Sequence, residues 1–480
     1  MSQPPVRFST KLLYGLGEIP ITVAMVLFGL FTLFFYNSVL GLPASLVGVC
    51  IFIGLAVDAV LDPYIGYRSD SIRRWLGRRH SLMLPAAILL GPSFWLLFRP
   101  PRNLSHSGLF AWLLVCWIAV RLSSALYRIP YLSLGAELSS DYDQRTSIFA
   151  TRALFGLAGT LAAAGLSFLL FFPASADGSD PKLHFAGYSR MGLVFGAVMS
   201  ITGLLSAIAT LPYRSFGDRA ASDRSGMPFW SGFRISMANT SFRGAWFYFV
   251  LFYLGVVLNA SVAVQYFTWY AKIQAGTKLS AITSSFYVGA CAGVFLWMTL
   301  AKRFEKRRLC VIATLGTSAL LFSATLLIGE GRLFGTGSAL PLLLGHLTGG
   351  FIASALWVLP PSMIADVADE DEVRTDRRRE GMYFGILNLG EKISSGGALL
   401  LAGVLLSLLG QIAPGAAPGQ RVAAPYIGLM YGAVPGTLLV LASLLILPYR
   451  LDRRSLAAIQ ERRAIHHAPL ETRMEKAEHA

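Results

Sequence analysis

Two aspartates four residues apart, Asp58 and Asp62, lie inside a long apolar stretch of the sequence. In a helix, residues four apart share one face, so both carboxylates point the same way. Neighbouring carboxylates disfavour joint ionisation, so such a pair can share a cation or hold one proton between them. The sequence therefore predicts a cation- or proton-binding pair. The alternative is that both acids only neutralise Arg68, Arg73 or Arg74 near one end of their helix.

Other charged side chains also fall inside apolar stretches. Arg121, Ser124 and Arg128 follow the i, i+3 and i+7 pattern of one helix face, and Arg152 lies in the next apolar stretch. A charge at the centre of a bilayer costs about 2.5–3.5 kcal/mol on insertion scales, so such residues are kept where they are paired, hydrated or used. We expect the arginines to face a hydrated cavity, to form a network with acids, or to do both. The other charges of this kind are Glu18, Glu391 and Lys392.

Four lone polar residues also lie in apolar stretches. A polar side chain on a membrane helix usually finds its partner on a neighbouring helix. We therefore expect hydrogen bonds across helices, rather than solute contacts, at Asn259, Gln265, His346 and Asn388.

The residues named above need helices that cross a membrane. A spanning helix takes about 20 apolar residues, since the hydrocarbon is about 30 Å thick and each residue rises 1.5 Å. The sequence holds twelve such stretches, near residues 12–38, 45–68, 80–99, 109–133, 145–172, 189–212, 242–270, 280–301, 309–329, 338–363, 382–410 and 423–448. No cleavage site follows the first stretch, which is predicted to be a retained helix. The predicted fold class is an all-α membrane protein with twelve transmembrane helices.

The twelve stretches fall into two groups of six. The longest internal connection, near residues 213–243, is rich in Ser, Gly and charge. Basic runs follow the second and eighth stretches, at 66–79 and 301–308, as a faint internal repeat. Two related halves are typical of transporters of the major facilitator type. We predict an N-terminal six-helix bundle at 1–212, a cytoplasmic linker at 213–241, a C-terminal six-helix bundle at 242–448 and a cytoplasmic tail at 449–480.

The composition excludes several classes of soluble protein. Of the 480 residues, 54% are hydrophobic and 14% are charged, whereas soluble domains carry roughly 25% charged residues. A net charge of +15 would favour nucleic-acid binding in a soluble protein. Here the basic residues gather in connections on one side of the spans, which sets membrane topology. We therefore expect no nucleic-acid partner, and both termini on the cytoplasmic side of a bacterial inner membrane.

The sequence also lacks the marks of an enzyme. No nucleophile elbow, phosphate loop or metal-ligand cluster is present. The four cysteines, Cys50, Cys116, Cys291 and Cys310, have no metal-ligand spacing and are interpreted as reduced packing residues. We expect no catalytic residue, no metal and no cofactor.

A densely charged segment, DVADEDEVRTDRRRE, spans residues 366–380. We interpret it as a cytoplasmic loop that exchanges salt bridges when the two halves move, which would make it a gate. A solvated charge run is the alternative, because exposed ion pairs are individually weak. The gate candidates are Asp366, Asp369, Arg377, Arg378, Arg379 and Glu380.

Several motifs together resemble one known family. They are Tyr14-Gly-Leu-Gly17, Asp58-Ala-Val-Leu-Asp62-Pro-Tyr-Ile-Gly66, Ser69-Asp70, Arg73, Gly77-Arg-Arg79 and Asp366-Val-Ala-Asp369-Glu-Asp-Glu372, followed by Arg377 to Glu380, Gly381 to Gly385 and Lys392. This set resembles the glycoside–pentoside–hexuronide:cation symporters, the melibiose-carrier branch of the major facilitator superfamily. The resemblance covers both halves. It implies inward movement of a solute coupled to H⁺, Na⁺ or Li⁺.

The resemblance also assigns roles to individual residues. Asp58 and Asp62 match the family's cation-site acids, Arg152 matches a substrate-contacting arginine in helix five, and Lys392 matches a lysine near the cation site. We add Arg128, Glu18, Thr22 and Arg121 as candidate substrate-binding residues.

The chain departs from the sugar-binding members of that family at several positions. Those members have Lys-Asp in helix one, where this chain has Ile21-Thr22, and an Asp in helix four, where it has Arg128. The melibiose type also has Asn before the second acid and Thr in helix four; this chain has Leu61 and Ala125. Leu61 and Ala125 offer no oxygen ligand for sodium, so H⁺ is favoured over Na⁺ as the coupling ion.

The sequence thus indicates a cation-coupled symporter that moves a sugar, glycoside or sugar-acid-like solute by alternating access. One alternative of the same fold is a transporter of a lysolipid or another amphiphilic anion. The other is a non-transporting membrane assembly factor, which loss of the acids would favour. The expected partners are a small-molecule substrate and the lipid bilayer, and the expected state is a monomer.

Overall fold

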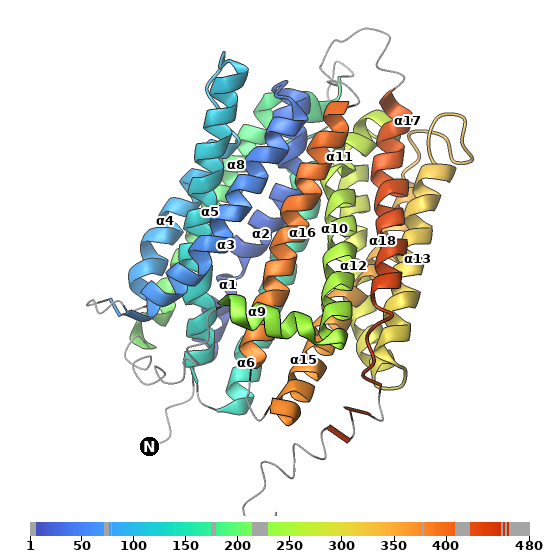
Figure 1. Cartoon of the computed structure of the whole chain (residues 1–480). Coiled ribbons are helices and arrows are strands. Elements are labelled where there is room, and N and C mark those ends of the chain that lie inside the picture. The colour runs from blue at the N-terminus through green and yellow to red at the C-terminus, as the bar shows by residue number, and fades with distance from the viewer. Residues whose placement is uncertain are drawn as a thin grey trace, which may run out of the picture.

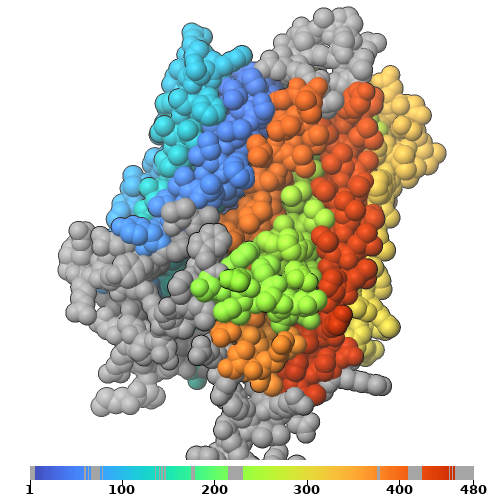
Figure 2. All heavy atoms as spheres, in the orientation of Figure 1, coloured from blue at the N-terminus to red at the C-terminus, as the bar shows by residue number. Residues whose placement is uncertain are grey.

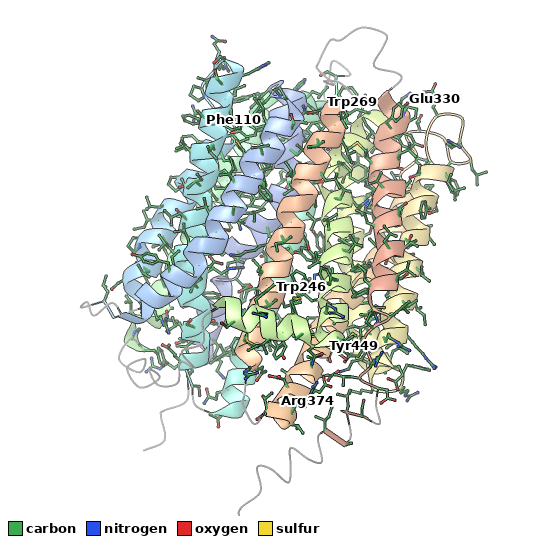
Figure 3. All side chains as sticks on the ribbon, viewed as in Figure 1. Phe110, Trp246, Trp269, Glu330, Arg374 and Tyr449 are labelled. Carbon is green, nitrogen blue, oxygen red and sulfur yellow. The ribbon has the colours of Figure 1, made fainter. Side chains whose placement is uncertain are left out.

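The computed structural model of the chain describes residues 6–71, 76–77, 79–139, 141–173, 179–213, 229–375, 379–408, 423–452, 455–456 and 458–459. Within these residues the chain forms helices and no strand, and the helices run side by side as a bundle (Figure 1). We call the two ends of the bundle by the view in Figure 1. Phe110, Trp269 and Glu330 lie at the upper end, and Arg374 and Tyr449 lie at the lower end (Figure 3).

The N-terminal helices form one packed group. They are α1 (Phe8–Leu16), α2 (Ile19–Leu27), the π-helical segments η1 (Phe28–Thr32) and η2 (Phe35–Val39), α3 (Ala44–Ser71), α4 (His80–Leu97), α5 (His106–Glu137), α6 (Tyr142–Leu161), η3 (Ala162–Leu166), α7 (Ser167–Phe171), the short η4 (Pro181–Leu183) and α8 (Phe185–Thr210). Helix α4 packs against α5 and α8, and α6 packs against α1 and α2.

The C-terminal helices form a second group. They are α9 (Phe229–Ala238), α10 (Thr240–Ser261), α11 (Ala263–Gln265), η6 (Tyr266–Tyr270), α12 (Gly276–Ala301), α13 (Lys306–Leu327), α14 (Leu340–Ala353), α15 (Ala355–Thr375), α16 (Glu380–Leu408), α17 (Ala423–Gly428), η8 (Leu429–Ala433) and α18 (Val434–Leu445). Helix α10 packs on α16 and α18, and α12 packs on α14.

The prediction of an all-α membrane fold is confirmed. Eleven stretches in the described residues are long and apolar enough to cross a membrane. The twelfth predicted span corresponds to α3, a helix of 28 residues whose apolar part, Ala44–Asp58, is shorter. The proposed boundaries at residues 212, 241 and 448 stay a prediction.

The sequence analysis expected a loop at residues 366–380, but residues 366–375 are helical. Helix α15 continues to Thr375, and α16 begins at Glu380. No Gly or Pro interrupts residues 362–375, and Ile364, Val367, Ala368 and Asp371 form a buried face at helical spacing. This amphipathic pattern is the signal that the sequence analysis missed.

The connection predicted as a plain linker also contains a helix. Helix α9 lies across the lower part of α16 and α10 on the face shown in Figures 1 and 2. Its Phe233 and Met237, one turn apart, pack against the buried cluster of the C-terminal helices. A Cβ at Gly232 would lie 2.7 Å from the Met382 sulfur, so this glycine lets α9 lie close against α16.

The buried apolar side chains form one shared cluster and two separate ones. The largest cluster includes Leu27 and Phe31 from the N-terminal helices and Tyr266, Leu279 and Leu399 from the C-terminal helices. The second contains only residues after 241, and the third only residues before 208. Phe110 and Trp269 pack on the shared cluster, whereas Trp246 and Tyr449 belong to the second (Figure 3). The two halves therefore share a core at the upper end and keep separate cores at the lower end.

Polar contacts at the upper end also join the two halves. The Thr283 hydroxyl donates to the Ala164 carbonyl at 2.8 Å, and the Ser45 N–H donates to the Ser407 hydroxyl at 2.7 Å. The Lys182 ammonium is fully buried and donates to the Ile273 carbonyl at 2.8 Å. Burial lowers the pKa of Lys182, and the Asp180 carboxylate at 2.8 Å opposes that change. This conformation is closed at the upper end.

Candidate functional site

The predicted acid pair lies against α5 within the N-terminal helices. Asp58 and Asp62 on α3 face Arg121 and Arg128 on α5, respectively. Arg121 Nη2 forms an ion pair with Asp58 Oδ2. Arg128 Nη2 lies 3.4 Å from Asp62 Oδ2. Because residues four apart on α3 and seven apart on α5 keep one helix face, the two ion pairs form one row between the two helices.

A lysine from the C-terminal helices completes this row. Lys392 Nζ on α16 lies 2.5 Å from Asp62 Oδ2 and donates to the Asp58 carbonyl at 3.1 Å. Among the described residues, Lys392 is the side chain that brings an opposite charge to the acid pair from the other half of the chain. We call Asp58, Asp62, Arg121, Arg128 and Lys392 the acid-pair network.

Several polar atoms of this network have no partner in the described structure. They are Asp58 Oδ1, Arg121 Nε and the neighbouring Ser124 Oγ, all of which are buried. Buried polar groups are normally hydrogen-bonded, and a native exception calls for an explanation such as a missing water or ion. Asp58 Oδ1 therefore offers a free acceptor position for a proton or a cation. The Asp58 side chain is only 6% exposed, whereas Arg128 is 42% exposed and is the most exposed member of the network.

A second charged cluster surrounds the first helix. Glu18 stands where α1 ends and α2 begins, because Pro20 in the first turn of α2 has no N–H to continue the helix. Arg152 Nε on α6 lies 3.0 Å from Glu18 Oε2. A Cβ at Gly156 would lie 3.0 Å from Glu18 Cγ, so this glycine lets α6 approach the break. The Thr22 hydroxyl donates to the Glu18 carbonyl at 3.2 Å.

Two tyrosines hold this helix break in place. The Tyr14 hydroxyl donates to the Tyr131 carbonyl and the Tyr131 hydroxyl donates to the Tyr14 carbonyl, both at 3.1 Å. The rings stack with centroids 4.6 Å apart. This reciprocal pair fixes α1 against α5, and the sequence analysis recorded Tyr14 only as part of a motif.

The structure thus brings together the residues that the sequence singled out, in two groups. The expected internal network of arginines and acids is present. The described contacts of Asp58 and Asp62 are to Arg121, Arg128 and Lys392; the side chains of Arg68, Arg73 and Arg74 lie outside the described residues. A further contact was missed, in which the Tyr253 hydroxyl donates to Glu391 Oε1 at 3.2 Å.

Two of the gate candidates, Asp366 and Arg379, form contacts within the C-terminal helices. Asp366 Oδ2 lies 2.5 Å from Lys306 Nζ at the start of α13 and accepts from the Tyr449 hydroxyl at 3.2 Å. Arg379 Nη1 lies 3.4 Å from Asp371 Oδ2. Arg377 and Arg378 lie outside the described residues. On the N-terminal side, Arg79 and Glu137 pair at 2.7 Å, in keeping with the separate cores of the lower end.

The lone polar residues behave differently from one another. Asn259 donates to the Tyr431 carbonyl at 2.7 Å and His346 bonds the Tyr431 hydroxyl at 3.1 Å, as expected for contacts across helices. Gln265 differs from the expectation, because its buried amide nitrogen and oxygen have no partner in the described structure. Asn388 is exposed.

Comparison with known proteins supports the membrane-transporter fold. The family described as MFS/sugar transport protein matches residues 13–453. The isoprimeverose transporter of Lactiplantibacillus pentosus is 23% identical over 96% of this chain and 93% of its own length. The sphingosine-1-phosphate transporter MFSD2B of Mus musculus is 25% identical over 91% and 88% of the two chains. The crystal structure of a D-xylose-proton symporter is similar to this chain with a TM-score of 0.63 and 16% identity, and the match covers 93% of this chain and 99% of that chain.

Breaking the two ion pairs of the acid-pair network should lower the stability of the folded protein by unequal amounts. Arg121→Met leaves Asp58 buried without its cation, which typically costs about 3–5 kcal/mol. Arg128→Met removes a more exposed partner, for which the usual cost is about 0–1 kcal/mol. The apparent unfolding temperature of purified protein in detergent measures both. Adding Asp58→Asn to Arg121→Met should restore much of the loss. Equal effects of the two single substitutions would contradict the assignment of Asp58 as the buried acid.

Proposed function

We propose, on the premise that this chain belongs to the MFS/sugar transport protein family, that it is a proton-coupled symporter of a sugar, glycoside or sugar acid. The chain is a multi-pass membrane transporter and not an enzyme, as that family and the eleven apolar spans indicate. The single observation that carries the proposal is Asp62, whose Oδ2 contacts cations from both halves of the molecule. An acid in that place can link ion binding to relative movement of the halves.

The link follows from charge. Protonation of Asp62 removes the charge that attracts Lys392, which then keeps only its hydrogen bond to the Asp58 carbonyl. The link between α3 and α16 weakens, while the arginines of α5 stay with the N-terminal helices. Loading and release of one proton therefore changes how strongly the halves hold together at the middle of the bundle, which is the requirement for alternating access around a fixed site.

A proton suits this site better than sodium. Hard cations need several oxygen ligands, and the neighbouring Leu61 and Ala125 supply none from their side chains. Both oxygen-rich groups nearby are already engaged, since Asp62 Oδ2 contacts two cations and Asp58 Oδ2 contacts Arg121. A single carboxylate such as Asp62 can accept a proton, whereas it replaces little of the hydration of a sodium ion.

The basic side chains favour a solute that carries negative charge or many hydroxyls. The two clusters contain four cations, Arg121, Arg128, Arg152 and Lys392, against three carboxylates, Asp58, Asp62 and Glu18. Arginine presents a planar fork that binds carboxylates and vicinal oxygens in pairs. Arg128 and Arg152 are the most exposed of the four, so we assign them to the solute, with Glu18 and Thr22 beside them. A sugar acid fits this balance best.

A second candidate is a transporter of amphiphilic anions such as lysolipids. It is favoured by the resemblance to a sphingosine-1-phosphate transporter and by the same excess of arginine. The assembly-factor alternative has less support, because the acid pair is present and joined to the other half by Lys392.

The lower end is assigned to the cytoplasm. Basic connections gather there, and the conformation with separate lower cores is then open to the inside. We place the protein in a bacterial inner membrane as a monomer with both termini inside. Asp366, Asp369, Arg379 and Glu380, with Arg377 and Arg378 beside them, are proposed to exchange partners with the N-terminal helices when this end closes.

The coupling proposal is tested by solute uptake into proteoliposomes. An imposed pH gradient should drive uptake by the native protein, and a sodium gradient at fixed pH should not. Asp62→Asn should abolish gradient-driven uptake, because the amide cannot take up and release the proton. Glu330→Gln, at an exposed acid of the upper end, is the matched control and should behave as the native protein. Uptake that follows sodium and ignores the pH gradient would overturn the proton assignment.

The solute assignment is tested at Arg152. Arg152→Gln should abolish binding of the solute while the protein stays folded, because the amide keeps a donor but loses the charge and the fork geometry. Thermal shift against sugars, sugar acids and lysolipids measures binding, since a ligand of the folded state raises its stability. Arg102→Gln, at an exposed loop residue, is the control. Unchanged affinity in Arg152→Gln would remove Arg152 from the solute site.

The gate proposal is tested by accessibility. Asn388 lies one turn before Lys392 on the same face of α16, so a cysteine at 388, in a background without the four native cysteines, reports entry from the lower end. Arg379→Glu should raise its labelling rate, because charge reversal weakens the state in which the lower end is closed. Arg303→Glu in the exposed α12–α13 turn controls for general charge effects. Equal labelling in all three proteins would show that the charged segment is only solvated.

A further inference from the structure

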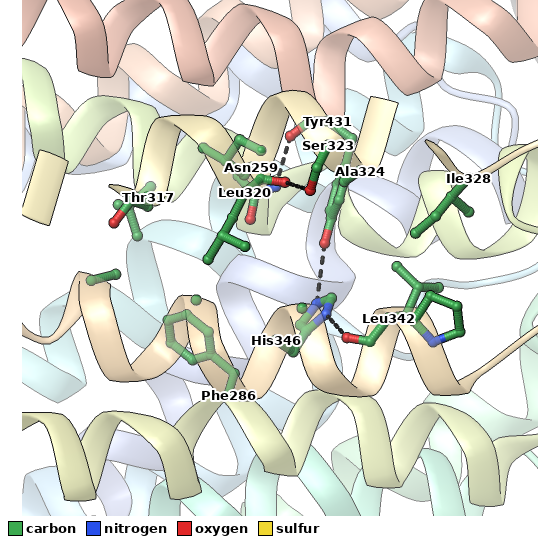
Figure 4. A pocket seen from close by; sticks show the side chains of 16 residues that line it. Asn259, Phe286, Thr317, Leu320, Ser323, Ala324, Ile328, Leu342, His346 and Tyr431 are labelled. Carbon is green, nitrogen blue, oxygen red and sulfur yellow. Dashed lines mark hydrogen bonds between the residues drawn. The ribbon is translucent and has the colours of Figure 1, made fainter. Parts of the chain in front are cut away.

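A partly open cavity lies within the C-terminal helices, away from the acid-pair network. It encloses about 660 Å³ of empty space, part of which is open to the outside. Figure 4 shows it between α13 and α14, with Tyr431 on one side and Phe286 on the other. None of the charged residues of the proposed transport site lines it. We call this space the α13–α14 cleft.

The cleft exists because α14 packs more closely against α12 than against α13. Gly289 and Gly293 on α12 and Gly350 on α14 let these two backbones meet, since a Cβ at any of the three would collide with a carbonyl group of the facing helix. Small residues are the usual device for close approach of membrane helices. Helix α14 is held toward α12, and this leaves space on its opposite side.

Two further glycines of α14 widen that space. Gly345 and Gly349 are four residues apart, and a Cβ at either would meet nothing within 4 Å. Glycine inside a helix is less favourable than alanine, because it loses more conformational freedom on folding. Packing against a neighbour does not require these two glycines. Their effect is to keep the wall of the cleft smooth and wide.

The lining is apolar with a polar group between its two ends. Leu320, Leu321 and Phe286 line the deeper part together with Gly349 and Ala353. Asn259, Ser323, His346 and Tyr431 form the polar part. His346 lies six residues after the first residue of α14 at the upper end of the span, about 9 Å along the axis at 1.5 Å per residue. The polar part therefore lies above the deeper apolar part and below Ile328, Pro341 and Leu342, which line the upper end of the cleft.

His346, Tyr431, Ser323 and Thr317 already donate hydrogen bonds within the protein. His346 Nδ1 lies 2.8 Å from the Leu342 carbonyl, and its Nε2 lies 3.1 Å from the Tyr431 hydroxyl. A carbonyl only accepts, so Nδ1 carries a proton and Nε2 of the neutral ring accepts from Tyr431. Ser323 donates to the Leu320 carbonyl and Thr317 to the Ala313 carbonyl. The hydroxyl oxygens of Tyr431, Ser323 and Thr317 remain able to accept.

We propose that the α13–α14 cleft binds a neutral, hydroxyl-bearing monoacyl lipid of the monoacylglycerol class from the bilayer. Its chain lies along Gly345 and Gly349 between the two helices, and its hydroxyl groups donate to the acceptors near His346. No Asp, Glu, Lys or Arg lines the cleft, so a charged headgroup would be left without a partner in a region of low polarity. The walls are themselves membrane-spanning helices, so a lipid reaches the cleft sideways from the hydrocarbon.

The test uses a monoacylglycerol with a photoreactive diazirine in its acyl chain, added to proteoliposomes of the native protein. After irradiation, mass spectrometry should locate the label on residues of α13 and α14 that line the cleft. Lipids with the same chain but a phosphate or trimethylammonium headgroup should label these residues at least roughly tenfold less. Equal labelling by the charged lipids would overturn the neutral-lipid assignment.

Gly349→Leu fills the cleft and should lower labelling at these residues at least roughly tenfold. Gly385→Leu is the matched control, because Gly385 is also a helix glycine with open space around it but lies outside the cleft. Gly349→Ala is the second variant, small enough to keep the fold, and should lower labelling less than leucine does. Labelling spread over lipid-facing residues of all helices, or unchanged in Gly349→Leu, would show that the cleft holds no lipid site.

Discussion

The contact between Asp62 and Lys392 is the interaction around which the rest of the structure is arranged. A charge at the depth of these helices is tolerated only with a partner, and each of these two residues supplies the other's partner from the opposite half of the chain. Arg128 shares the same carboxylate oxygen, so the negative charge of Asp62 is divided between an arginine of its own half and a lysine of the other half. A change in the charge of the Asp62 carboxylate therefore alters contacts with both halves at once.

The apolar cores show which parts of the two halves are joined and which are separate around this contact. Above it the two halves share one buried cluster and several hydrogen bonds, including the buried Lys182 against the Ile273 carbonyl. Below it each half has a cluster of its own, and the described charge pairs stay within one half. Because packed cores have low compressibility, each half moves as a unit. The halves can then separate at the lower end while the shared cluster keeps them joined at the upper end. The Asp62–Lys392 contact lies where the joined and the separate parts meet.

Glycine decides how closely the C-terminal helices pack. Where α12 and α14 meet, Gly289, Gly293 and Gly350 remove the side chains that would hold the backbones apart. Where α13 faces α14, Gly345 and Gly349 have no such neighbour, so the same residue type leaves a cleft there. The charged network and this cleft occupy different helices, and the molecule therefore contains two chemically distinct environments: one of arginine and carboxylate, and one of hydrocarbon with a few hydroxyl groups.

The sequence by itself determined the membrane-spanning helices, because apolar runs of that length need a bilayer whatever their partners are. It also determined which charges are costly, so Asp58, Asp62, Arg121, Arg128, Arg152 and Lys392 could be named before any contact was known. The sequence analysis wrongly predicted a loop at residues 366–375, because the many charges there were not expected on a helix with a buried face. Only the tertiary structure decided that Lys392 contacts Asp62 across 330 residues of chain and that Arg152 pairs with Glu18. It also decided that α14 packs more closely on α12 than on α13. The local sequence pattern determines the length of each helix and which of its faces is buried. Which residue a charged side chain contacts depends on how whole helices pack.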